Sequence, residues 1–193
     1  MFQETPARHK KNKGSIEVIC GSMFSGKTEE LIRRLKRAQF ARQKVAIFKP
    51  NLDTRYDKNK VISHDLNEIN SQAISGSNML LETHGNIEVV GIDEAQFFDI
   101  ELPAVCSELA SRGVRVIVAG LDMDYLGVPF GPMPKLMSIA EFITKVHAIC
   151  MDCGDLALHS HRTAASKDLV HIGEQKEYQA LCRFCFGKKT PPR

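Results

Sequence analysis

The stretch from Cys20 to Thr28 constrains the fold of this chain more than any other part of the sequence. It reads Cys-Gly-Ser-Met-Phe-Ser-Gly-Lys-Thr, so four residues separate Gly21 from the Gly26-Lys27-Thr28 tripeptide. This is the spacing of a phosphate-binding loop, in which a buried strand leads into a glycine-rich turn and then into a helix. A β-rich run over residues 16–20 precedes the turn, and a helical pattern follows it. A chance glycine loop before a structural helix is the alternative, but the strand, the lysine and the threonine argue against it.

The polar groups of this loop have expected roles. Its backbone N–H groups and the N-terminus of the next helix would face an anion, because the glycines allow close approach. Lys27 would reach the β- and γ-phosphates of a nucleoside triphosphate, and the Thr28 hydroxyl would ligate Mg²⁺.

A carboxylate pair, Asp93-Glu94, directly follows the apolar run of residues 87–92. A carboxylate at the carboxyl end of a buried strand is the expected Mg²⁺ partner of a phosphate loop, and we assign this role to Asp93. Glu94 is then free to take a proton from an attacking hydroxyl or to orient a water molecule. The alternative is that both side chains only cap the following helix.

These motifs lie in an alternation of β-rich and helical runs, which is typical of a parallel α/β sheet with helices on both faces. We expect strands over residues 16–20, 45–49, 87–92, 114–120 and 145–150, and helices over residues 27–42, 102–111 and 136–143. The basic residues of the first helix would form a solvated face; they are Arg33, Arg34, Lys36, Arg37 and Arg42.

The polar residues 51–85 would form a mobile connection over the phosphate site. Arg55 in this segment would stabilise charge on a transferring phosphoryl group, or it would be an ordinary surface residue.

Length and charge limit the classes of partner. A chain of 193 residues can hold one full α/β domain and a small annex. The net charge of +3 is too small by itself to indicate a nucleic-acid partner. Residues 1–14 are basic and polar and lack the apolar core of a secretory signal, so we expect a flexible leader. No apolar run is long enough to span a membrane, and a reducing cytoplasm is the expected compartment.

Four of the six cysteines form two Cys-x-x-Cys pairs, Cys150 with Cys153 and Cys182 with Cys185. Four thiolates suit tetrahedral Zn²⁺, and a site that protein ligands fill completely is structural. The 28 residues between the pairs exceed the usual ribbon spacing of about 15–20, so we expect a useful segment between them. A redox pair or an iron–sulfur cluster is the alternative. The other two thiols, Cys20 and Cys106, are most simply small buried residues.

A phosphate loop, strand-end carboxylates and Mg²⁺ together indicate phosphoryl transfer from a nucleoside triphosphate. The acceptor stays open at this point: water would make an ATPase, and a hydroxyl would make a kinase with Glu94 as base. Apolar and aromatic surface for a flat acceptor would come from Met23, Phe97, Phe98, Leu121, Tyr125, Phe130 and Tyr178. Each of these residue types is individually more often core than ligand.

Several motifs occur in a fixed order along residues 15–187. The most specific are Met23-Phe24-Ser25 inside the phosphate loop and the run Asp93-Glu94-Ala95-Gln96-Phe97-Phe98. The others are Asp53-Thr54-Arg55-Tyr56, Gly120-Leu121-Asp122, Pro129-Phe130-Gly131 and both cysteine pairs. In this order they resemble the motifs of the thymidine kinases of the cytosolic, zinc-containing type.

This resemblance implies a RecA-like P-loop sheet over residues 15–146, after the leader of residues 1–14. It implies a zinc-binding and lasso subdomain over residues 147–187, followed by a tail over residues 188–193. The implied reaction is Mg²⁺-dependent transfer of the γ-phosphoryl group of ATP to the 5′-hydroxyl of thymidine, and also of deoxyuridine, in DNA-precursor salvage. The resemblance further implies a cytoplasmic homotetramer that thymidine triphosphate inhibits, without a nucleic-acid or membrane partner.

The resemblance also implies roles for single residues, with Glu94 as general base, Phe97 packed on the thymine ring and Tyr125 beside the nucleoside. The implied ATP-binding residues are Gly21, Ser22, Met23, Phe24, Ser25, Gly26, Lys27, Thr28, Asp93, Glu94, Ala95 and Gln96. The implied neighbours of the base and its 5-methyl group are Met23, Leu121, Phe130, Ser160 and Tyr178. A lasso would read the base edge through the backbone of Leu169, Val170, His171, Ile172 and Gly173.

Some positions depart from the family pattern. Ser160 stands where Thr is common, and Tyr125 stands where Phe is common. Leu169 and His171 stand where smaller β-branched residues are frequent. These changes leave the reaction intact and bear on base preference and on the packing of the lasso.

Two rival functions belong to other classes. A nucleic-acid-stimulated ATPase with a zinc module would need a basic track, for which Lys188, Lys189 and Arg193 are a thin case. A non-catalytic nucleotide-binding scaffold would keep the phosphate loop but would give Glu94 no purpose.

Overall fold

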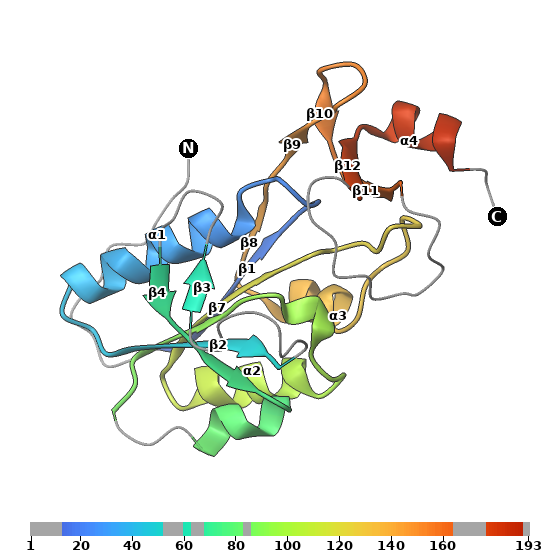
Figure 1. Ribbon diagram of the computed structural model, residues 1–193. Coiled ribbons are helices and arrows are strands. Elements are labelled where there is room, and N and C mark those ends of the chain that lie inside the picture. Colours follow the sequence, from blue (N-terminus) through green and yellow to red (C-terminus); the bar gives the residue numbers. More distant parts are fainter. Residues whose placement is uncertain (1–12, 52–59, 63–67, 83–85, 164–176, 191–193) are drawn as a thin grey trace.

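A six-stranded parallel sheet forms the centre of the computed structural model, which describes residues 13–51, 60–62, 68–82, 86–163 and 177–190 (Figure 1). The strands of this sheet are β1 (Ser15–Cys20), β2 (Val45–Pro50), β5 (Gln72–Ile74), β6 (Val89–Ile92), β7 (Arg115–Gly120) and β8 (Phe142–Lys145). Their order across the sheet is β5-β2-β6-β7-β1-β8, and every neighbouring pair is parallel. The predicted class, a parallel P-loop α/β sheet, is confirmed.

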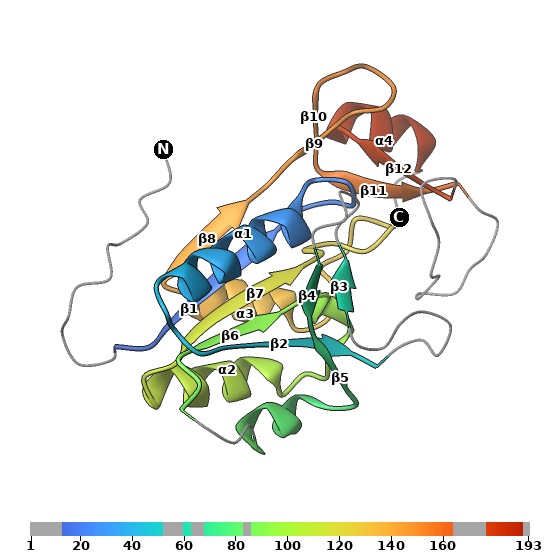
Figure 2. The same cartoon turned by 60° about the vertical axis from the view of Figure 1, so that its left-hand side comes forward.

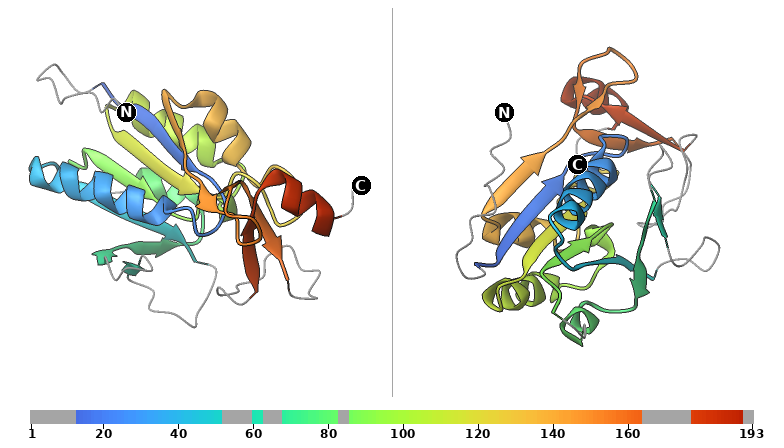
Figure 3. Two further views of the ribbon diagram at one scale, coloured as in Figure 1. Left: turned by 90° about the horizontal axis from the view of Figure 1, so that it is seen from above. Right: turned by 90° about the vertical axis from the view of Figure 1, so that its left-hand side faces the viewer.

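Helices cover both faces of the sheet, as Figure 3 shows in the view from above. Helix α1 (Lys27–Phe40) packs on one face. The other face is covered by η1 (Ser77–Glu82), α2 (Leu102–Ser111) and α3 (Met133–Ile139). A short turn, η2 (Ala95–Phe97), follows β6.

Successive residues of each central strand enter different apolar layers. In β1, Val18 lies in the layer under α2 and α3, whereas Ile19 lies under α1. Ile117 and Val118 in β7 divide in the same way. Because both faces are buried, these strands read as almost continuous apolar runs in the sequence. Gly91 of β6 admits the Leu35 side chain of α1, since a Cβ at this glycine would overlap it.

The strand order gathers the polar motifs at one edge. In a parallel sheet all carboxyl ends lie at the same edge, where ligands of open α/β sheets bind. Strand β7 separates β1, which leads into the phosphate loop, from β6, which leads into Asp93-Glu94. This is the RecA-like arrangement that the sequence resemblance implies.

Beyond β8 the chain builds a small unit at the carboxyl edge of the sheet, which we call the annex (residues 147–190; Figure 2). It contains β9 (Ala148–Ile149) paired with β10 (Leu156–Ala157), and β11 (His159–Arg162) paired with β12 (Tyr178–Leu181). Helix α4 (Arg183–Lys189) closes it. Its buried apolar cluster consists mostly of alanine and cysteine, with Leu181 and Phe186 as the larger members.

Several predicted boundaries are wrong. Ile143, expected at the end of a helix, lies in β8, and the strand expected over residues 145–150 is replaced by β8 and the short β9. Helix α3 ends at Ile139, after which the chain is extended at Ala140 and returns to the sheet beside β1. The strand predicted from residue 87 begins at Val89.

The polar connection after β2 is more structured than expected. It contains a small hairpin of β3 (Lys60–Ile62) and β4 (Glu68–Asn70), and then β5, which joins the main sheet beside β2. In the part of the annex that the structure describes, the strand that pairs with β11 is β12. Among the described residues, no helix has the length and apolar character needed to cross a membrane.

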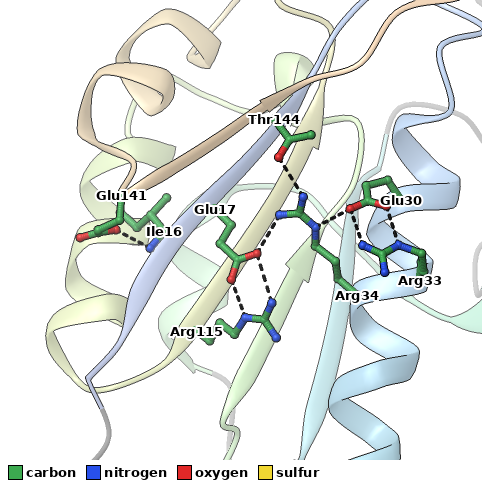
Figure 4. Close-up of polar contacts among 8 residues, drawn as sticks. All are labelled: Ile16, Glu17, Glu30, Arg33, Arg34, Arg115, Glu141 and Thr144. Atoms are coloured by element: carbon green, nitrogen blue, oxygen red, sulfur yellow. Dashed lines mark hydrogen bonds and ion pairs between the residues drawn. The ribbon is translucent and has the colours of Figure 1, made fainter. Parts of the chain in front are cut away.

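The predicted solvated face of α1 is wrong for Arg34, which is buried. Its guanidinium bonds Glu17 of β1 and Glu30 of α1, both at 2.8 Å, and Thr144 of β8 at 2.9 Å (Figure 4). Arg115 of β7 bonds the same Glu17 at 2.6 Å. Paired charges of this kind fix how α1 lies across the strands, and losing one partner would leave the other charge buried.

Candidate active site

The phosphate loop is closed by contacts of its own and by the chain that leaves β8. Gly21 has a φ of 148° and a Cβ there would overlap the backbone oxygen of Val146, so glycine is required by both angle and space. The Cys20 oxygen accepts a hydrogen bond from the Val146 amide at 2.8 Å. The linker between sheet and annex therefore packs directly on the first glycine of the loop.

Lys27 and Ser25 both bond the Ser22 carbonyl, at 2.8 Å and 2.7 Å, which draws their side chains over the loop. Burial lowers the pKa of Lys27, although the carboxylates of Glu94 and Asp93 oppose this shift. The buried Ser22 hydroxyl has no hydrogen-bond partner among the described residues. A phosphate would satisfy this group and would pair with the Lys27 ammonium, so the residues present fit the expected anion.

A hydroxyl and a carboxylate come together where α1 meets β6. The Thr28 hydroxyl lies 3.2 Å from Asp93 Oδ2 and donates to it. Burial, followed by the charge of Glu94, raises the pKa of Asp93 to about 7. One hydroxyl and one carboxylate beside a phosphate site are the oxygen ligands that Mg²⁺ takes in nucleotide-binding loops. These two residues therefore fit the expected ion.

Glu94 occupies a backbone conformation that its residue type rarely adopts. Its φ is 51° and ψ is 40°, which is left-handed and non-glycine. Such strain is found at functional sites, where the surrounding structure imposes it. The Gln96 amide nitrogen donates to Glu94 Oε2 at 2.5 Å, while the Gln96 oxygen accepts from the Leu121 amide at 2.9 Å. The exposed carboxylate is thus aimed by a buried glutamine.

Three of the apolar residues predicted for the acceptor, Phe97, Leu121 and Phe130, lie around the turn that follows Glu94. Phe98 is instead buried in the sheet core, so its predicted place on the acceptor surface is wrong. Phe97 lies edge-on to Phe130, with ring centroids 5.5 Å apart. Leu121 is joined to the same turn through Gln96. All three side chains are partly exposed, so they are available to a flat ligand rather than consumed by the core.

Ser160 connects the annex to the phosphate loop. Its hydroxyl oxygen accepts a hydrogen bond from the Met23 amide at 2.9 Å. Phe24 of the same loop packs against the buried cluster of the annex. Ser160, predicted from the resemblance as a neighbour of the 5-methyl group, therefore also holds the backbone of the loop.

The four cysteines come together in the annex. Their sulfur atoms all lie within 4.8 Å of one another, and those of Cys153 and Cys182 are 3.6 Å apart. Tetrahedral sulfur ligands of Zn²⁺ lie about 3.8 Å apart, because each Zn–S bond is about 2.3 Å long. The Cys182 sulfur also accepts from the Cys185 amide at 3.4 Å. The cluster fits a structural zinc ion.

Comparison with known proteins decides the family. The thymidine kinase family model matches residues 14–186 of this chain. The chain belongs to the thymidine kinase family. A thymidine kinase of Bacteroides fragilis (strain YCH46) is 59% identical over 188 residues, which cover 97% of this chain and 94% of that protein. One from Bacteroides thetaiotaomicron is 58% identical over 96% of this chain and 94% of its own length. One from Rhodothermus sp. (strain ITI 518) is 53% identical over 96% and 86%.

Among solved structures, the genome packaging NTPase B204 of Sulfolobus turreted icosahedral virus 2 is similar at a TM-score of 0.44 and 16% identity. The similarity covers 71% of this chain and 76% of that one.

Some residues that the thymidine kinase resemblance singles out are not among those described. Arg55 and the lasso residues Leu169, Val170, His171, Ile172 and Gly173 lie outside the described residues. The two remaining thiols are buried as predicted, and burial raises the pKa of Cys20 to about 11 and that of Cys106 to about 12.

Sequence reasoning missed Arg162. This buried residue of β11 bonds the hydroxyl of Tyr178 and lies over the ring of Tyr125, the two tyrosines predicted for the nucleoside. The sequence offers no signal for this role, because residues 158–162 read Leu-His-Ser-His-Arg and show no apolar alternation that would mark a buried face.

Proposed function

We propose that this chain transfers the γ-phosphoryl group of ATP to the 5′-hydroxyl of thymidine, and also of deoxyuridine, giving the nucleoside monophosphate and ADP. The observation that carries the proposal is the position of Glu94. In a chain of the thymidine kinase family, this residue follows the carboxyl end of β6, its charge acts on Lys27 of the phosphate loop, and its carbonyl accepts from the Phe97 amide.

The phosphate loop holds the triphosphate. Backbone N–H groups of the loop face the phosphates, except that of Met23, which donates to Ser160. Lys27 moves from the Ser22 carbonyl to the β- and γ-phosphates. Thr28 and Asp93 would hold Mg²⁺, which supplies charge neutralisation on the β- and γ-phosphate oxygens when it is bound.

Glu94 acts as the general base. It accepts the proton of the 5′-hydroxyl as that oxygen attacks the γ-phosphorus, and the bond from the γ-phosphorus to the bridging oxygen breaks to release ADP. The Gln96 amide keeps the carboxylate oxygen in place during this transfer. A glutamine at this position would have the shape of glutamate without its charge, so it would not remove the proton of the 5′-hydroxyl.

The nucleoside would lie between the loop after β7 and the annex. We assign Phe97 to the face of the thymine ring and Met23, Leu121, Phe130, Ser160 and Tyr178 to its surroundings, with Tyr125 beside the nucleoside. The backbone of residues 169–173 would read the base edge. The aromatic contact between Phe97 and Phe130 and the bond between Ser160 and Met23 support this placement.

Residues 147–187 of the annex would form a zinc-binding and lasso subdomain, apart from the nucleotide-binding domain of residues 15–146. A structural Zn²⁺ on Cys150, Cys153, Cys182 and Cys185 would hold it together. A leader over residues 1–14 and a tail over residues 188–193 complete the proposed division.

Assembly and regulation follow the family. We infer a cytoplasmic homotetramer that thymidine triphosphate inhibits by occupying both halves of the site. The exposed apolar side chains of β8, Phe142 and Ile143, support a contact between subunits. This strand ends the sheet among the described residues, and an exposed apolar edge is usually covered.

The test is ATP consumption in the presence of Mg²⁺, with and without thymidine. Uridine, deoxycytidine and single-stranded DNA serve as controls, and the products are separated by chromatography. We expect strong stimulation by thymidine with equal amounts of thymidine monophosphate and ADP. Stimulation by DNA alone would overturn the proposal and leave an ATPase with a metal-bearing annex, and the assignments of Phe97 and Tyr178 would be withdrawn.

A further inference from the structure

Arg162 makes two different contacts with two tyrosines. It lies opposite Tyr178 in the antiparallel register of β11 and β12, and both side chains are buried. Its Nε and Nη2 donate to the Tyr178 hydroxyl oxygen at 3.0 Å and 2.8 Å. Its central carbon, Cζ, lies 3.8 Å from the centroid of the Tyr125 ring. A planar guanidinium can make both contacts at once, because its donors lie at the edge and its face is free to stack.

These contacts join separate parts of the chain. Tyr125 belongs to the loop that leaves the carboxyl end of β7, whereas Arg162 and Tyr178 belong to the annex. Arg162 therefore connects the sheet edge to the annex through one side chain. Without this group, the ring of Tyr125 would lose its stacking partner in the annex.

The strand that carries Arg162 also faces the phosphate loop. Ser160 is two residues earlier on β11 and bonds the Met23 amide. Side chains two residues apart in a strand point to the same face. The face of β11 that carries Ser160 and Arg162 thus lies along the region where phosphate loop, Tyr125 and Tyr178 converge.

We propose that Arg162 is a positioning residue for the nucleoside, acting through the two tyrosines that it clamps. This inference rests on the proposed function, which places Tyr125 and Tyr178 beside the nucleoside. Arg162 fixes the angle of one ring and the hydroxyl of the other, so that the acceptor pocket is formed before the nucleoside binds. A pre-formed pocket binds its ligand without the cost of ordering side chains.

The test compares Arg162→Met, Arg162→Lys, Tyr178→Phe and the Arg162→Met/Tyr178→Phe double variant with the unchanged protein. Arg162→Met keeps the length and apolar stem but removes every donor. Arg162→Lys keeps the charge and loses the planar fork. Lys189→Met is the matched control, because Lys189 also reaches β12, bonding Gln179 at 3.1 Å and Asp152 at 2.9 Å, but it does so on the exposed side.

For each variant the KM for thymidine, the KM for ATP, kcat, metal content and thermal midpoint are measured. We expect Arg162→Met to raise the KM for thymidine about 10- to 100-fold, the range for losing hydrogen bonds to a charged group. The KM for ATP should change less than about threefold, because neither Arg162 nor Tyr178 belongs to the phosphate loop. Arg162→Lys should recover part of the loss, and Lys189→Met should match the unchanged protein.

The KM for thymidine in the double variant should be no higher than in the worse single variant. The bond to the Tyr178 hydroxyl, which Tyr178→Phe removes, is already lost in Arg162→Met. A thymidine KM that stays within about twofold in both Arg162→Met and Tyr178→Phe would overturn the inference. So would a parallel rise of both KM values together with loss of metal, since that pattern indicates only a structural role. If Arg162→Met does not fold, Tyr178→Phe decides the question alone. Failure of the unchanged protein to use thymidine would overturn the proposed function, and this inference with it.

Discussion

The sheet and the annex are stabilised in different ways. The sheet buries large aliphatic side chains in two layers, such as Ile19 and Leu35 on one face and Val118 and Leu102 on the other. The annex buries mainly alanine and cysteine. Apolar burial stabilises by about 25 cal/mol per Å², so small side chains supply little. The annex also contains four cysteine sulfurs within 4.8 Å of one another. A metal bound to them would supply the stability that a larger apolar core supplies elsewhere.

This difference has a consequence for the site. The phosphate half rests on elements that the sheet core holds, namely β1, α1 and β6. The nucleoside half includes Ser160, Arg162 and Tyr178, whose position depends on the annex. Loss of metal should therefore lower the affinity for the nucleoside more than the affinity for ATP.

Metal removal should have the largest effect, and it should act on the annex alone. Structural Zn²⁺ contributes about 10–16 kcal/mol to folding in zinc-finger peptides, so we expect the annex to unfold when the metal is chelated. Hydrogen exchange should show the amides of β11 and β12 losing protection while those of β1 and β7 keep it. A Cys106→Ala variant, which alters a thiol of the sheet core, should retain its metal. Uniform loss of protection over the whole chain would show that the stability of the sheet also depends on the metal.

Glu94→Gln tests the catalytic assignment on the sheet side. General base catalysis typically contributes about 10²- to 10⁴-fold, so turnover should fall by this range. Binding of ATP and thymidine should persist, because the amide keeps the shape of the side chain. Single-turnover kinetics with a calorimetric binding control would separate the two effects. Unimpaired turnover would rule out Glu94 as base.

A matched pair of leucines compares the two cores. Leu35 in α1 and Leu181 in β12 are both fully buried. Leu35→Ala should lower the free energy of unfolding by about 2–5 kcal/mol, as cavities in large apolar cores do. With metal bound, Leu181→Ala should change the urea unfolding of the sheet by less than about 1 kcal/mol. Equal losses would mean that the two regions unfold as one cooperative core.

Ser160→Ala should have the smallest effect. It removes the acceptor of the Met23 amide, and a neutral hydrogen bond contributes about 0.5–1.5 kcal/mol. The KM for ATP should therefore rise about two- to tenfold, because the loop loses one of its supports. Ser160→Thr keeps the hydroxyl and serves as the control. If Ser160→Ala and Ser160→Thr have the same KM for ATP, the bond between Ser160 and the Met23 amide does not contribute to ATP binding.

The sequence predicted the central strands well, because residues 114–120 and 87–92 are nearly continuous apolar runs. It failed at β8, since Leu136, Ile139, Ala140 and Ile143 mimic helical spacing while Ile143 lies exposed at the sheet edge. The phosphate loop and the Asp93-Glu94 pair could be predicted because the residues of each motif are close together in the sequence.

Contacts between residues that are distant in the chain could not be predicted from the sequence. Arg34 was predicted to lie on a solvated basic face, yet its partner Glu17 is in another element. Arg162 likewise acquires its role only when β11 meets β12 and the loop of Tyr125. A local pattern identifies a basic residue but does not show which carboxylate or aromatic ring the fold places beside it.

The most direct test of the division of the site is the affinity of each substrate before and after the annex loses its metal. The protein is treated with a chelator, returned to Mg²⁺ buffer, and titrated calorimetrically with thymidine and with a non-hydrolysable ATP analogue. We predict that thymidine affinity falls by more than about 100-fold, whereas affinity for the ATP analogue falls by less than about tenfold. Thymidine affinity that survives metal removal unchanged would contradict the account, because the nucleoside half of the site would then not depend on the annex.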